Sequence, residues 1–365
     1  MKKVKKLIFK PGIFFRDYFN KKYPVVNNEQ NICEEDEYIL IKHSLAFSEL
    51  ESGIKDNPEI DVVFTWVNNQ DSAWQRKYNA ATCDFTRTAL YGNDKARFSN
   101  HNELYYSVYS VQKFMPWVRT IYIVTDAQIP AWFNPENAGN IRIIDHTEII
   151  DTQYLPTFNS HVIEAHLHNI PGLSENFIYF NDDVFVARPL QAGHFFRPNG
   201  IASLFTADKK LTVMQKKGVA TPTLNASLNS IKLLQRKHDS FINMPLVHTY
   251  VPLKKSMYHL AWQEFEPEIR TFLSNKLRAD NDLNMATFLV PWLAYLEGQA
   301  VFTREICYYF NIRSAHAMAQ YAKLLQSTQT QQQPHSFCAN DFNSKKNIPD
   351  YQEKLVLMLK NYYQI

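Results

Sequence analysis

Two adjacent carboxylates, Asp182 and Asp183, follow the apolar stretch FIYF at residues 177–180. Aromatic and β-branched residues are typical of a buried strand, and a carboxylate there is costly unless it meets a cation, a donor or solvent. Carboxylate oxygens suit Mg²⁺ or Mn²⁺, which can in turn bind a diphosphate. The pair therefore predicts a metal or diphosphate site. The alternative is a strand-end turn in which Asp183 caps the next segment.

A second polar cluster lies in SHVIEAHLHN, residues 160–169, and it holds His161, Glu164 and His166. A zinc hydrolase usually places two histidines about four residues apart on one helix face, with a glutamate beside them. His161 and His166 are five residues apart, so their side chains point to different sides of a helix. Core or surface histidines are the expected interpretation, and a zinc-dependent hydrolase stays open as an alternative.

Three further motifs carry polar groups suited to phosphate chemistry. His248, in VHTYVP between two prolines, would be a competent general base when neutral, although a loop histidine is often structural. Arg278, in KLRADND, offers a planar fork that can grip a phosphate in two places, or simply a solvated helix end. FCANDF adds Asn340 and Asp341 far along the chain. No single motif decides the function.

These residues need elements that bring them together, and the apolar patterns predict an α/β fold. Strands are predicted at 59–69, 119–126, 140–146 and 177–183, with helices at 102–115 and 157–169. Strands alternating with helices imply a largely parallel sheet, in which ligands bind beyond the carboxyl ends of the strands. The predicted strands end in polar residues, namely Asn68, Asp126, Asp145 and His146, and the pair Asp182 and Asp183.

The overall composition excludes several classes of protein. The chain has 365 residues, of which 45% are apolar and 21% charged, as in a globular protein with a substantial core. The net charge of +3 gives no basic field that would indicate nucleic acid as the main partner. Four cysteines without a CxxC pair favour a reducing compartment, and we expect a cytoplasmic protein. No apolar stretch reaches the roughly 18 residues of a membrane span.

The first residues of the chain have a character of their own. Residues 1–22 hold eight Lys or Arg and one Asp, interleaved with leucine, isoleucine and phenylalanine. No uninterrupted apolar core of signal-peptide length follows. A basic segment with aromatic residues suits an anionic membrane surface or a docking partner. The alternative is a solvated N-terminal arm.

Four stretches of the chain follow one another in a recognisable order. The first is DVVFTWVNNQD (61–71), and the third extends over 247–283. The second and most specific runs from ARFSNHNELYYSVYSVQKFMPWVRTIYIVTDAQIPAWF (96–133) through IRIIDHTEI to LPTFNSHVIEAHLHNIPGLSENFIYFNDDVFVARPL (155–190). The fourth is FCANDF. In this order they resemble the Stealth family of sugar-1-phosphate transferases, which includes bacterial capsule polysaccharide phosphotransferases and the related animal N-acetylglucosamine-1-phosphotransferase.

The resemblance implies a fold, a reaction and partners. The fold would be Rossmann-like and GT-A-like, with a mostly parallel sheet, flanking helices and a helical C-terminal part. The enzyme would move a hexose- or N-acetylhexosamine-1-phosphate from a UDP-sugar to a sugar hydroxyl of the growing capsule polymer, giving a phosphodiester and UMP. Its partners would be the UDP-sugar donor and the capsule oligosaccharide acceptor, with peripheral contact to the inner membrane or capsule machinery and no nucleic acid.

The same resemblance implies roles for individual residues. His248 would be the base for the acceptor hydroxyl, Arg278 would hold the donor phosphate, and Asp183 and Asp341 would bind Mg²⁺ or Mn²⁺. The residues expected to bind the nucleotide are Asp61, Thr65, Trp66, Asn68, Arg97, Asn102 and Asp182. After the first strand the family usually has glycine or aspartate, and this chain has Asn68 and Asn69 instead.

On this interpretation the chain divides into five segments. They are a basic N-terminal arm and lead-in (1–57), an α/β core for the nucleotide sugar (58–200), a basic insertion or lid (201–245), a helical part that completes the active site (246–325), and a polar linker with FCANDF and a C-terminal helix (326–365). The lysine-rich stretch 207–239 is expected either to attract a polyanionic acceptor or to be a solvated loop. Its lysines include Lys209, Lys210, Lys216 and Lys217.

Two other functions fit part of the same pattern. A glycosyltransferase of the GT-A type would attack the sugar carbon and release UDP, so the leaving nucleotide separates the two reactions. A non-catalytic sugar-binding module would not depend on His248. The polar ends of the predicted strands favour an enzyme.

Overall fold

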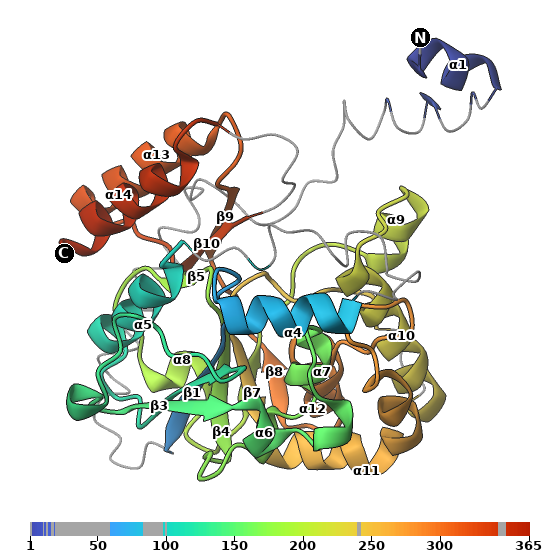
Figure 1. The fold of residues 1–365 in the computed structure, drawn as a ribbon, viewed down its shortest axis with the longest axis horizontal. Coiled ribbons are helices and arrows are strands. Elements are labelled where there is room, and N and C mark those ends of the chain that lie inside the picture. Colours follow the sequence, from blue (N-terminus) through green and yellow to red (C-terminus); the bar gives the residue numbers. More distant parts are fainter. Residues whose placement is uncertain are drawn as a thin grey trace.

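The centre of the molecule is a five-stranded sheet. The computed structural model describes residues 2–9, 11, 14, 15, 18, 59–82, 98, 101–238, 242–341 and 348–365. The strands of the sheet are β1 (Ile60–Thr65), β2 (Ile121–Thr125), β3 (Ile141–Asp145), β4 (Asn176–Asn181) and β7 (Val251–Lys254). Their order is β3-β2-β1-β4-β7; the first four strands are parallel to one another, and β7 is antiparallel to β4. In Figure 1 the sheet lies below helix α4 (Ser72–Thr82). The predicted α/β fold with a mostly parallel sheet is confirmed.

The burial of each strand follows from its place in the sheet. All five residues of β2 are buried, as are the first five of β1, because both strands lie inside the sheet. Their near-continuous apolar sequences, IDVVFT and IYIVT, are typical of parallel strands covered on both faces. In the edge strand β3, by contrast, only Ile141 and Ile144 are buried. All four predicted strands, which are β1, β2, β3 and β4, lie where the apolar runs indicate.

A second, three-stranded sheet stands next to the first. Its strands are β5 (Val184–Val186), β10 (Ser336–Asn340) and β9 (Cys307–Asn311), in the order β5-β10-β9. The turn that carries Asp182 and Asp183 joins β4 of the first sheet directly to β5 of the second. The acidic pair therefore lies at the junction of the two sheets.

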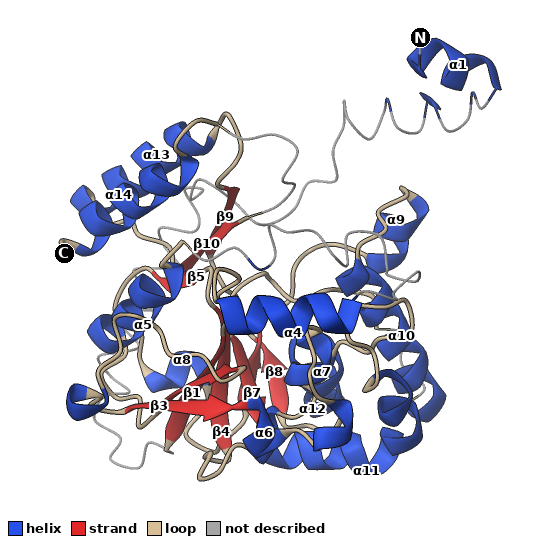
Figure 2. Cartoon of the chain, viewed as in Figure 1, coloured by secondary structure: helices blue, strands red, loops and turns tan. Residues whose placement is uncertain are grey.

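Helices surround both sheets (Figure 2). They are α4 (Ser72–Thr82), α5 (Glu103–Phe114), α6 (His146–Ile149), α7 (Ser160–Glu164), α8 (Ala192–Phe195), α9 (Leu211–Lys216), α10 (Pro222–Lys237), α11 (Lys255–Phe272), α12 (Val290–Leu296), α13 (Ala317–Gln329) and α14 (Tyr351–Tyr363). Helix α10 begins where its sequence indicates, because Thr221 caps the backbone N–H of Leu224 and Pro222 occupies the first turn. Aromatic side chains of α14 pack on the second sheet, where Tyr362 and Tyr363 contact Phe337.

The C-terminal half departs from the expected helical region at about 256–325. Beside α11, α12 and α13 it contains the strands β8 (Ala300–Phe302) and β9, and a π-helical turn, η5 (Met285–Leu289). Strand β8 pairs with β6 (Ala202–Leu204) in a separate two-stranded sheet. Local periodicity missed these short strands because their partners lie far away in the sequence. The predicted helix at 157–169 is likewise shorter, with α7 followed by a 3₁₀ turn, η4 (Leu167–Asn169).

The N-terminal segment contains helix α1 (Lys2–Phe9). Its side chains Val4, Ile8 and Phe9 are largely exposed. Within the described parts of the chain, no helix is both long and apolar enough to cross a bilayer.

Candidate active site

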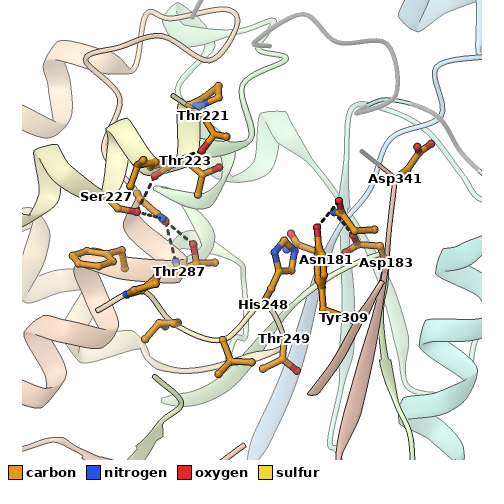
Figure 3. A pocket seen from close by; sticks show the side chains of 18 of the residues that line it. Asn181, Asp183, Thr221, Thr223, Ser227, His248, Thr249, Thr287, Tyr309 and Asp341 are labelled. Carbon is orange, nitrogen blue, oxygen red and sulfur yellow. Dashed lines mark hydrogen bonds between the residues drawn. The ribbon is translucent and has the colours of Figure 1, made fainter. Parts of the chain in front are cut away.

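A cavity of about 540 Å³ opens where the two sheets meet helices α9 and α10 and the π-helical turn η5. This volume lies in the range of small-molecule sites, about 300–1,000 Å³. Asp183, His248, Arg278 and Asp341, which come from distant parts of the chain, all line it. In Figure 3, Asp183 and Tyr309 lie on one wall with His248 beside them, and a group of hydroxyl side chains lies on the opposite wall. The hydroxyl wall consists of Thr221, Thr223, Ser227 and Thr287.

The acidic turn supplies the carboxylates of one wall. Asp183 Oδ2 accepts a hydrogen bond from Asn340 Nδ2 at 3.1 Å and lies 3.5 Å from Cys338 Sγ. Asp183 Oδ1 is buried and has no hydrogen-bond partner among the described residues. Burial and the neighbouring Asp183 carboxylate raise the pKa of Asp182 to about 7. Two crowded carboxylates with an unpaired buried oxygen are suited to a hard divalent cation.

Glu103, at the start of α5, adds a third carboxylate that the sequence analysis did not single out. It lines the cavity, and burial, together with the charge of Asp182, raises its pKa well above the usual value. The backbone N–H of His101 donates to its side chain. An acid in the first turn of a helix is common for reasons of helix stability alone, so the sequence held no distinctive signal for Glu103.

His248 lies just before β7 and faces the wall that carries Asp183. Its ring packs against that of Tyr309, with 5.5 Å between centroids, and Tyr309 donates to Asn340 Oδ1 at 2.9 Å. A ring nitrogen of His248, a carboxylate oxygen of Asp183 and Cys338 Sγ lie within 4.8 Å of one another. Because Mg²⁺ and Mn²⁺ prefer oxygen ligands, Asp183 is the best suited of the three to such a cation.

Arg278 lies on the wall opposite Asp183 and has neutral partners. Its Nη1 donates to Thr223 Oγ1 at 3.0 Å and its Nη2 to Ser160 Oγ at 2.6 Å. Its Nε is buried without a hydrogen-bond partner in the described part of the chain. Burial lowers the pKa of Arg278, partly offset by the charges of Glu164 and Asp282. A guanidinium held by hydroxyls keeps donors available for an anionic ligand.

Asp341, predicted as a metal ligand, is already engaged. It follows β10, and both of its carboxylate oxygens contact the guanidinium of Arg313. Oδ2 also lies 2.9 Å from His101 Nε2. Burial alone would raise the pKa of Asp341, but hydrogen bonds from Arg313 and His101 lower it. The structure thus brings Asp341 to the cavity but pairs its carboxylate with cationic and imidazole groups, which leaves little capacity for a metal.

Asp61, predicted to contact the nucleotide, lies at the wrong end of β1. It is fully buried near the amino end of the strand, whereas the cavity is at the carboxyl end. Its Oδ1 accepts from Arg119 Nε at 2.9 Å, and its Oδ2 accepts from the backbone N–H of Ser174 at 2.7 Å. The carboxylate is therefore occupied by a structural ion pair and does not line the cavity.

The other predicted nucleotide residues have varied surroundings. Thr65 bonds to the hydroxyl of Tyr179 at 3.0 Å, Trp66 is buried, and Asn68 exchanges two hydrogen bonds of 2.9 Å with Gln128. None of these three lines the cavity, although their neighbour Val67 does. Asn102 is an exposed residue before α5 that also lies outside the cavity lining. Arg97 lies outside the described residues.

The histidines of the possible zinc site do not converge. His161 Nδ1 lies 2.9 Å from Asp282 Oδ2, whereas His166 Nδ1 donates to the carbonyl of Val162 at 2.7 Å. Burial lowers the pKa of both imidazoles. Among the described residues, neither histidine belongs to a group of potential ligands spaced for a metal. The geometry agrees with the expectation of core histidines.

A polar cavity beyond the carboxyl ends of a mostly parallel α/β sheet is the usual position of an enzyme active site. Comparison with known proteins identifies the class more closely. The family regions described as Stealth protein CR1, conserved region 1, and Stealth protein CR2, conserved region 2, match residues 58–85 and 97–204. The chain belongs to the Stealth family of bacterial capsular polysaccharide phosphotransferases and is a transferase.

Whole-length relatives support this assignment. The chain is 60% identical over 366 residues to the capsular polysaccharide phosphotransferase LcbA of Neisseria meningitidis, covering 100% of both. It is 56% identical to a capsular polysaccharide phosphotransferase of Actinobacillus suis, covering 99% of this chain and 98% of that one. Among solved structures, the galactosyltransferase LgtC with donor and acceptor sugar analogs aligns with a TM-score of 0.40 at 11% identity, over 82% of this chain and 95% of that one.

Proposed function

We propose that this enzyme transfers a hexose- or N-acetylhexosamine-1-phosphate from a UDP-sugar to a hydroxyl of a growing capsule chain. A phosphodiester forms and UMP leaves. The names of the relatives, capsular polysaccharide phosphotransferases, support phosphate transfer and the class of polymer. The observation that carries the proposal is the pair of opposite walls in one cavity, with crowded acids on one side and the hydroxyl-held Arg278 on the other.

A metal-bound diphosphate would satisfy both walls. Asp183 and Asp182 are the residues that would hold Mg²⁺ or Mn²⁺, because their oxygens are crowded and Asp183 Oδ1 has no described partner. Bound there, the cation would neutralise charge on the diphosphate. Arg278 would grip phosphate oxygens from the other side with its remaining N–H groups. Asp341 is better suited to holding His101 and Arg313 at the edge of the cavity.

His248 is the residue we assign as the base. It lines the cavity next to Asp183, where an acceptor hydroxyl would approach the donor phosphorus. Taking the hydroxyl proton lets the oxygen attack phosphorus while the bond to the leaving UMP breaks. The C1–O bond of the sugar stays intact, so the anomeric configuration is retained without a covalent glycosyl-enzyme intermediate.

The leaving nucleotide tests this proposal against a glycosyltransferase reaction. Purified enzyme would be incubated with a panel of UDP-sugars, an oligosaccharide primer and Mg²⁺ or Mn²⁺, and the nucleotides separated by ion-exchange chromatography. Phosphate transfer releases one UMP for each sugar residue added. Stoichiometric UDP would show attack at the sugar carbon and would refute the proposal.

Lysines near the rim of the cavity would favour an anionic acceptor. Lys209 lines the cavity, and Lys210 and Lys216 are exposed at the two ends of α9. A chain that carries phosphodiesters is a polyanion and would be attracted there. Replacing Lys210 and Lys216 by Glu would weaken long acceptors more than short ones, and equal effects on both would contradict this role.

Helix α1 would provide peripheral contact with a membrane. It exposes Val4, Ile8 and Phe9, and lysines are interleaved with them in the sequence. An amphipathic basic helix binds anionic lipid through apolar insertion and charge attraction. Sedimentation with phosphatidylglycerol vesicles, but not with phosphatidylcholine vesicles, is expected for the full chain. Equal sedimentation of a variant with Ile8→Ser and Phe9→Ser would contradict it.

A further inference from the structure

Glu305 is a buried carboxylate at the centre of a hydrogen-bond cluster that the proposed reaction does not use. It lies in the loop between β8 and β9, and its side chain has no exposed surface. Oε1 accepts from the hydroxyls of Tyr250 and Ser336, at 2.9 and 2.8 Å. Oε2 lies 2.8 Å from His194 Nε2 and 3.3 Å from His335 Nδ1. The carboxylate thus ties together segments that are far apart in the chain.

Two of these contacts reach the short segment that carries His248. Tyr250 binds Glu305 directly, and Thr249 is linked to it through Ser336, whose Oγ lies 2.6 Å from Thr249 Oγ1. The carbonyl of His248 itself lies 3.4 Å from the Sγ of Cys307, two residues after Glu305. The two residues that follow His248 are therefore both anchored on one carboxylate.

A carboxylate is an unusual choice for a buried position. Replacing buried charges by well-packed apolar groups is often neutral or stabilising, so a retained charge points to a need for defined geometry. The hydroxyl donors of Tyr250 and Ser336 on Oε1, and the ring nitrogen of His194 beside Oε2, favour the ionised form of Glu305. An ionised carboxylate only accepts hydrogen bonds, and it can gather donors from several directions at once.

A metal site is the competing explanation for this cluster. Ligand atoms of His194, Glu305 and His335 all lie within 4.8 Å of one another. However, the backbone N–H of Ile306 donates to His335 Nδ1 at 3.1 Å, so the lone pair nearest Glu305 is already in use. Glu305 also has two hydroxyl donors on its other oxygen. These contacts favour a hydrogen-bond cluster without a metal.

We propose that Glu305 is a positioning residue, which holds the His248 imidazole at the height and angle needed in the cavity. It acts through Tyr250 directly and through Ser336 and Thr249. The expected effect of Glu305 on the reaction rests on the proposed role of His248 as the base. Its effect on the position of the His248 ring can be measured independently of that role.

The position of the ring can be followed by NMR of protein with isotope-labelled histidine, with the His248 signals assigned from a His248→Ala variant. Glu305→Gln preserves the shape of the side chain and removes its charge, so we expect the His248 signals to shift or split. Glu297→Gln is the matched control, because Glu297 also faces a histidine, His238, at 3.6 Å, but its side chain is 35% exposed. Unchanged His248 signals in Glu305→Gln would overturn the inference.

Kinetics give the second measurement. Glu305→Gln should lower kcat by about 10- to 100-fold, the usual effect of losing a partner that orients a functional group, with KM for the donor unchanged. In a His248→Ala background the same substitution should cause no further loss. Equal losses in both backgrounds would overturn the inference. If Glu305→Gln does not fold, Ser336→Ala can replace it in the same double-mutant cycle with His248→Ala. This substitution removes only the link from Glu305 to Thr249.

Two further outcomes separate this inference from the proposed role of His248 and from a metal site at Glu305. Full activity of His248→Ala would refute the proposed base, while the NMR result would still decide whether Glu305 positions the ring. Stoichiometric zinc in the purified enzyme, lost in Glu305→Gln, would show a metal site in place of the hydrogen-bond cluster and would overturn the inference.

Discussion

Arg278→Lys removes the planar fork of a guanidinium and keeps its positive charge. The hydroxyls of Thr223 and Ser160 fix the plane of the group through bonds of 3.0 and 2.6 Å, which leaves Nε and further N–H groups for a phosphate. A phosphate gripped in two places would lose one charge-assisted hydrogen bond, worth about 1.5–3 kcal/mol. At about 1.4 kcal/mol for each factor of ten, kcat/KM for the UDP-sugar should fall by about 10- to 150-fold.

The assay is the initial rate of phosphodiester formation, with thermal unfolding of each variant as a check on folding. Arg236→Lys is the matched control, because Arg236 lies on α10 and forms a 2.6 Å ion pair with Glu268 while its side chain is 60% exposed. Exposed pairs contribute little, so its rate should change by less than about twofold. A loss below about threefold in Arg278→Lys, with an unchanged melting temperature, would refute a two-point grip on phosphate.

Three further outcomes follow from the same contacts. Removal of divalent cations with EDTA should abolish transfer, and Mg²⁺ or Mn²⁺ should restore it; full activity without added metal after exhaustive chelation would contradict the metal site. Arg119→Met should lower the free energy of unfolding in urea by about 3 kcal/mol, because it leaves the Asp61 carboxylate buried with only backbone donors. Breaking a buried ion pair costs about 3–5 kcal/mol, and the low end applies because Arg119 is partly exposed. A loss well under about 1 kcal/mol would count against the pairing. Burial would raise the pKa of Asp282 and Asp341, but hydrogen bonds from His161 and Arg313, respectively, outweigh it and lower both pKa values. The two ionised carboxylates therefore stabilise the fold above about pH 4, and this stabilisation is lost as the pH falls through the lowered pKa values. A melting temperature that stays constant from about pH 5 to 2 would contradict this.

The main sheet and the acidic turn could be predicted from the sequence because their signals are local. An apolar run that ends in two acids requires only neighbouring residues to be recognised, and β4 with its turn lies where that run indicates. Asp61 was predicted to contact the nucleotide, although it stands near the start of its strand. Ligands of such sheets bind at the carboxyl ends of the strands, so its position in the sequence already argued against that role. Its partner Arg119 could not be inferred from spacing.

The second sheet and its contacts could not be predicted in the same way. Strands β5, β9 and β10 are short, and the pairing of β5 with β10 joins segments separated by more than a hundred residues, which no local period specifies. Asn340 reaches Asp183, and Tyr309 reaches Asn340, only because this sheet forms. The hydroxyl wall, which α10 and η5 form together, and the pairing of Asp341 with Arg313 arise in the same way from tertiary packing.

The most direct test of the central claim is the anomalous scattering of Mn²⁺ in crystals grown with a UDP-sugar. We predict a manganese peak at coordination distance, about 2.2 Å, from carboxylate oxygens of Asp183 or Asp182, with the diphosphate between this ion and the guanidinium of Arg278. His248 would then face the phosphorus that carries the sugar. A manganese ion or diphosphate bound elsewhere, with neither Asp183 nor Arg278 in contact, would contradict the account.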